Sequence, residues 1–114
     1  VRRQRQMCIR DSVCGILDVD TVGPGRRADD LACLVAHLST VQRMNVPQAD
    51  RMRQILTAWV PVFDSRVDPI ELRLRSAAVA ISLATGPYRS QEDNWQAETL
   101  SIVDAAEALV NQVA

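Results

Sequence analysis

The sequence predicts a mostly α-helical fold, with one short N-terminal strand followed by about four helices. Two observations lead to this fold class. Apolar residues recur at helical spacing in four stretches after residue 28, and Asp, Gly or Pro residues stand at the ends of these stretches. Hydrophobic residues make up 47% of the 114 positions, which is typical of one small packed domain and not of a disordered chain.

The expected strand is the apolar segment VCGILDV, residues 13–19. It begins and ends with β-branched valine, although Gly15 weakens the pattern. The sequence Gly23-Pro24-Gly25 then indicates a loop. Because the backbone donors and acceptors of a lone strand need a partner, we expect the natural protein to continue upstream of residue 13.

The first helix is expected over residues 29–44. Asp29 and Asp30 suit its N-terminus, where the helix dipole favours negative charge. Apolar residues, Leu34 among them, cover most of its surface and are expected to be buried, so we expect Cys33 to be a small buried hydrophobe and His37 to lie in or beside the core. Cys14 is also expected to be buried, and neither cysteine is placed for a disulfide or a metal pair.

The second helix is expected over residues 48–60. Pro61 is expected to end or kink it, because proline lacks the N–H that continues the helical ladder. Trp59 lies on its apolar stripe and is expected to anchor it in the core. The stripe consists of Met52, Ile55, Leu56, Trp59, Val60 and Phe63.

The third helix is expected to begin at Asp68 as N-cap, with Pro69 at the first helical position and Glu71 closing a capping box. It should end near Gly86-Pro87. Arg73 and Arg75 on this helix are expected to be solvated.

The fourth helix is expected to open at Ser90, with Asp93 three residues later. Its predicted buried stripe is Trp95, Ile102, Val103, Ala106, Leu109 and Val110.

The opening string VRRQRQMCIRDS, residues 1–12, holds four arginines and allows three interpretations. It could be a basic arm for nucleic acid or a membrane surface, or a disordered terminus. It also resembles the translation of a transposase adapter used in sequencing libraries, in an unbroken match from Arg2 to Asp11. We favour this third interpretation and leave residues 1–12 out of the fold as an artefact that is disordered or non-native.

Removing these residues takes away four Arg and one Asp, which leaves 9 basic and 13 acidic residues and a net charge of −4. A mildly acidic domain gives no support for a nucleic-acid partner. The sequence has no uninterrupted apolar run of about 18 residues, so no membrane partner is expected either. The expected location is the reducing cytoplasm.

Two acids, Asp18 and Asp20, stand at the end of the expected strand, and Asp30 opens the helix after the glycine loop. Carboxylates at positions i and i+2 of a strand point to the same side. Such a pair suits Mg²⁺, which binds carboxylate oxygens together with substrate phosphates. The alternative is that both acids only cap the turn.

The segment LDVDTVGPGRRADDLA, residues 17–32, resembles the motif I-D-W-(D/E)-x-A-x-x-G-D-x-x-x-D-L-A of the aminoglycoside phosphotransferase and choline-kinase-like family. SLATGPYRSQEDNW, residues 82–95, is similar to a segment of bacterial members. The resemblance implies that residues 13–114 are part of the C-terminal helical lobe of a protein-kinase-like fold. It also implies an ATP- and Mg²⁺-dependent enzyme that phosphorylates a hydroxyl of a small molecule.

The resemblance assigns a role to each acid. Asp18 would hold the Mg²⁺ that bridges the β- and γ-phosphates of ATP, and Asp20 would be a secondary ligand. Asp30 would support the catalytic region through hydrogen bonds to backbone. Val19 replaces the family's usual aromatic residue, and Arg26 stands where the family often has Asp.

On the substrate side, the resemblance suggests Trp95, Glu92 and Asp93, because acids near the C-terminus bind cationic substrates in aminoglycoside-type enzymes. Helix capping for the acids and a core position for Trp95 remain alternatives. The catalytic loop HGDxxxxN and the ATP-binding lysine are absent from the sequence. We therefore expect no catalysis by this chain alone, and a non-enzymatic helical interaction domain is the alternative function.

Overall fold

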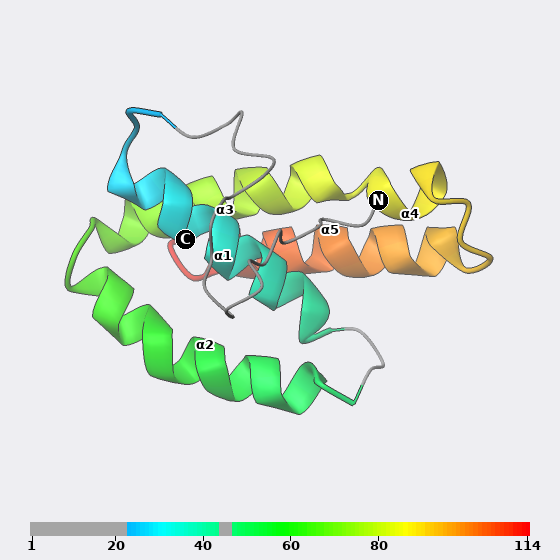
Figure 1. Cartoon of the computed structure of the whole chain (residues 1–114), viewed down its shortest axis with the longest axis horizontal. Helices are drawn as coiled ribbons and strands as arrows, with labels where there is room; N and C mark the ends of the chain where they lie inside the picture. Colours follow the sequence, from blue (N-terminus) through cyan, green and yellow to red (C-terminus); the bar gives the residue numbers. More distant parts are fainter. Residues whose placement is uncertain (1–22, 44–46) are drawn as a thin grey trace, which may run out of the picture.

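The computed structural model describes residues 23–43 and 47–114, and every regular element in these two ranges is a helix (Figure 1). The mostly α-helical prediction is therefore confirmed for this part of the chain. The expected strand at 13–19 and the string at 1–12 lie outside the described residues. The helices are α1 (Arg27–Val41), α2 (Ala49–Asp64), α3 (Pro69–Leu83), α4 (Gly86–Arg89) and α5 (Trp95–Asn111).

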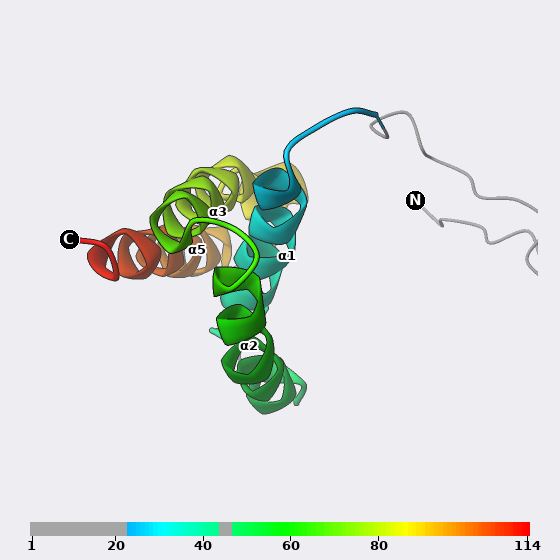
Figure 2. The ribbon, with the colours of Figure 1, turned by 90° about the vertical axis from the view of Figure 1, so that its left-hand side faces the viewer.

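The long helices α3 and α5 lie side by side and run in opposite directions, joined by the short α4 (Figure 1). Helix α1 crosses this pair and makes its most extensive contacts with α3. Helix α2 packs mainly against α1 and extends away from the α3–α5 pair, which Figure 2 shows with that pair seen nearly end on. The core therefore lies where α1 meets α3 and α5.

Small side chains dominate this core. Alanines from three helices are fully or almost fully buried, and Ser76 is buried with its hydroxyl donating to the Leu72 carbonyl at 2.7 Å. Small residues let helix backbones approach closely, so the apolar volume comes from a few larger side chains. The core cluster is Ala32, Val35, Ala36, Leu56, Leu72, Ala77, Ala80, Ala106 and Leu109.

The N-cap of α3 is Asp68, as the sequence predicts. The Asp68 Oδ1 accepts hydrogen bonds from the backbone N–H of Ile70 at 2.8 Å and of Glu71 at 3.4 Å, and Pro69 is the first helical residue. Such a cap contributes about 1 kcal/mol. The predicted capping box is wrong in its second half, because the Glu71 carboxylate accepts hydrogen bonds from Arg75 and Arg26.

Two helix boundaries differ by four or more residues from the prediction, the end of α2 and the start of α5. Helix α2 continues through Pro61 to Asp64, because Val60 and Phe63 pack against the core and hold the last turn in place. The backbone N–H of Ser65 still donates to the Pro61 carbonyl at 3.3 Å. The helix expected from Ser90 starts only at Trp95, since Gly86-Pro87 open α4 and Gln91 has a φ of 54° that breaks the helical path.

Several residues predicted to be buried are exposed. They are Cys33 and Leu34 on α1, Trp59 on α2, and Val103 and Val110 on α5. Their apolar spacing is real, but no described helix covers those faces. Among the described residues, no helix has the length and apolar character needed to cross a membrane.

Candidate functional site

The two predicted metal-binding acids, Asp18 and Asp20, lie outside the described residues. The described chain starts in the glycine loop, where Gly23 and Gly25 are exposed, and enters α1 at Arg27. Within residues 23–43 and 47–114, no three His, Cys, Asp or Glu side chains gather closely enough to hold a metal ion. The Mg²⁺ site stays a prediction about the segment before α1.

Asp30 lies in the first turn of α1 and is exposed. It shares one face of the helix with Cys33, Leu34 and His37, at positions i, i+3, i+4 and i+7, and all four residues are exposed. The prediction of a buried or partly buried His37 is therefore wrong. The His37 ring donates from Nδ1 to the Cys33 carbonyl at 2.6 Å, which ties the ring to its own helix.

The neighbouring acid, Asp29, connects the start of α1 to α3. Its Oδ1 accepts from Arg75 Nη1 at 2.5 Å, and Arg75 Nε donates to Glu71 Oε1 at 2.8 Å. Glu71 Oε1 also accepts from Arg26 Nη1 at 3.3 Å. These partly exposed ion pairs connect the first turn of α1 to α3, and the glycine loop at 23–25 separates this turn from the predicted metal-binding acids in the sequence.

Arg75 is half-buried in this network and not simply solvated as predicted, with 34% of its side chain exposed. The hydrogen bond to Glu71, together with the charge of Asp29, raises the pKa of Arg75 above its ordinary value. The charged guanidinium ion-pairs with both carboxylates. Asp29 and Glu71 are 42 positions apart in the sequence, which is why helical spacing alone could not reveal the network.

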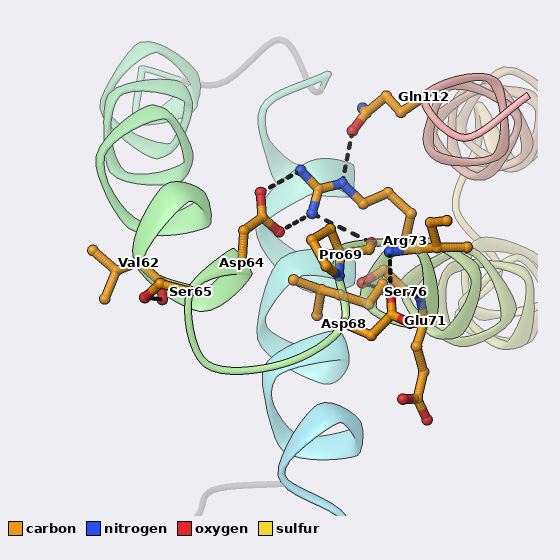
Figure 3. Close-up of polar contacts among 11 residues, drawn as sticks. Val62, Asp64, Ser65, Asp68, Pro69, Glu71, Arg73, Ser76 and Gln112 are labelled. Carbon is orange, nitrogen blue, oxygen red and sulfur yellow. Dashed lines mark hydrogen bonds and ion pairs between the residues drawn. The ribbon is translucent and has the colours of Figure 1, made fainter.

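Arg73 differs even more from its predicted solvated state. Its side chain is only 16% exposed and makes a bidentate ion pair with Asp64 at the end of α2, with Nη2 at 2.8 Å from Oδ2 (Figure 3). Its Nε donates to Gln112 Oε1 at 3.3 Å. Arg73 thus links α2, α3 and the chain end after α5.

The three predicted substrate-side residues, Glu92, Asp93 and Trp95, lie together beside α4. They line an open hollow of about 430 Å³ with Tyr88, Arg89 and Gln91. The rings of Tyr88 and Trp95 meet edge to face, with centroids 5.1 Å apart and an interplanar angle of 71°. Trp95 is partly buried, and the other five residues are exposed.

This hollow combines aromatic rings with two carboxylates, which are the groups that attract an organic cation. Arg89 places one positive charge in the same lining. Sequence reasoning missed Tyr88 and Arg89, although both stand in the GPYRSQEDNW segment that the family resemblance includes. The turn at Gln91 brings them opposite Glu92 and Trp95, and spacing did not predict that turn.

Comparison with known proteins found no match: no family model, no curated protein and no solved structure is significantly similar to this chain.

Proposed function

We propose that residues 13–114 form part of the C-terminal lobe of an ATP- and Mg²⁺-dependent phosphotransferase of protein-kinase-like fold, which phosphorylates a hydroxyl of a small molecule. The starting point is the motif LDVDTVGPGRRADDLA, in which a glycine loop separates two acids from a helix that begins with Asp29-Asp30. In such an enzyme Mg²⁺ neutralises charge on the transferred phosphoryl group. Asp18 and Asp20 would hold that ion, and Asp30 would support the catalytic region.

The observation that carries this proposal is a face of α1 that no other described helix covers. Asp30, Cys33, Leu34 and His37 share this face, and Leu34 is 36% exposed. A helix face that holds Leu, Cys and His side chains is suited to packing against further protein. The resemblance places the catalytic region against Asp30, on this same face.

The aromatic and acidic hollow beside α4 is suited to the acceptor. Tyr88 and Trp95 offer ring surfaces, and Glu92 and Asp93 offer negative charge. A hydroxyl compound that also carries an amine or ammonium group fits these features best. The proposed phosphotransferase activity and the proposed class of acceptor can be tested separately.

A first test is the source DNA. Reads that extend upstream of codon 13 without adapter sequence should encode an HGDxxxxN-type loop and a lysine-bearing β-lobe. A start codon directly before Val13, preceded by a stop codon, would overturn the proposal.

The extended protein then allows a test on the protein itself. It should consume ATP in the presence of Mg²⁺ and an acceptor, and Asp18→Asn should reduce the rate by at least 100-fold because the metal loses its main ligand. Asp104→Asn, an exposed acid on α5, is the matched control and should leave the rate unchanged. Equal activity of both variants would remove Asp18 from the metal site.

Accessibility of Cys33 tests the uncovered face directly. In a variant with Cys8 and Cys14 replaced by serine, the Cys33 thiol should react rapidly with a thiol reagent in the 114-residue chain. The same thiol should react at least tenfold more slowly in the extended protein. Equal reaction rates would show that nothing packs against this face of α1.

The alternative, a non-enzymatic helical interaction domain, is favoured by a second set of exposed apolar side chains. Ile70, Leu74 and Ile81 lie on one face of α3 and are 57%, 47% and 51% exposed. An extended protein that binds no Mg-ATP, with an upstream region lacking the catalytic loop, would favour this function.

A further inference from the structure

We draw no further inference here: the strongest candidate, the apolar face of α3 on which Ile70, Leu74 and Ile81 are exposed, is unpartnered among the described residues, and nothing in the structure shows what covers it.

Discussion

At the scale of single residues, the ion pair between Asp64 and Arg73 is the most shielded one among the described residues. The side chains are 26% and 16% exposed, whereas Arg53 and Asp50 are 57% and 83% exposed. Exposed pairs contribute about 0–1 kcal/mol, and breaking a fully buried pair costs about 3–5 kcal/mol. We place Asp64–Arg73 between these limits.

Asp64→Ala should therefore lower the free energy of unfolding by about 2 kcal/mol, because Arg73 would lose its bidentate partner in a partly buried position. Urea unfolding of Asp64→Ala, Arg73→Ala and the double variant measures this and gives the coupling energy. Asp50→Ala serves as the exposed control and should cost under about 0.5 kcal/mol. A coupling energy near zero would show that the pair does not stabilise the junction of α2 and α3.

At the scale of elements, the close packing of α1, α3 and α5 depends on alanine. Ala80 on α3 is fully buried in the core cluster, and Ala78, two positions earlier, is exposed. A larger side chain at Ala80 has no room without moving a neighbouring helix, because protein interiors are close-packed. The same helix thus offers a core position and a surface position of identical residue type.

Ala80→Leu should destabilise the protein by about 1–3 kcal/mol, the usual cost of overpacking. Ala78→Leu should change stability by less than about 0.5 kcal/mol, because its side chain points away from the core. Thermal unfolding of the two variants compares them directly. Equal effects at both positions would contradict the assignment of the buried face of α3.

At the scale of the whole molecule, apolar side chains remain exposed on several helices. Leu34, Trp59, Ile70, Leu74 and Ile81 are between 36% and 57% exposed. Scattered apolar residues are normal on a protein surface, but several on one helix face mark a contact surface. Helix α3 has such a face.

The 114-residue chain should therefore bind a hydrophobic dye such as ANS and increase its fluorescence. Replacing Leu74 and Ile81 together by glutamine should reduce the signal by about half while circular dichroism is unchanged, because the helix is retained and only surface changes. Replacing Ser82 by glutamine on the same helix is the control. A chain that unfolds cooperatively and gives no dye signal would contradict the idea that further protein covers these faces.

The sequence by itself determined the local structure of this protein. Asp68 and Pro69 define the start of α3 through short-range hydrogen bonding and a fixed φ, and apolar spacing placed the long helices within a few residues. The predicted end of α2 and the predicted start of α5 were wrong. Packing of the partly buried Phe63 against the core outweighed the break expected at Pro61, and the turn at Gln91 delayed the last helix to Trp95.

Only the tertiary structure decided which apolar faces are covered and which charges meet. Spacing shows that Cys33 and Leu34 lie on an apolar helix surface, but only the positions of α2 and α3 show that the described helices leave their face open. Arg75 reaches Asp29, and Arg73 reaches Asp64 and Gln112, through helix crossings that a linear pattern does not contain. The hollow of about 320 Å³ lined by residues of α1, α2, α3 and α5 exists for the same reason, because these helices are separate in the sequence.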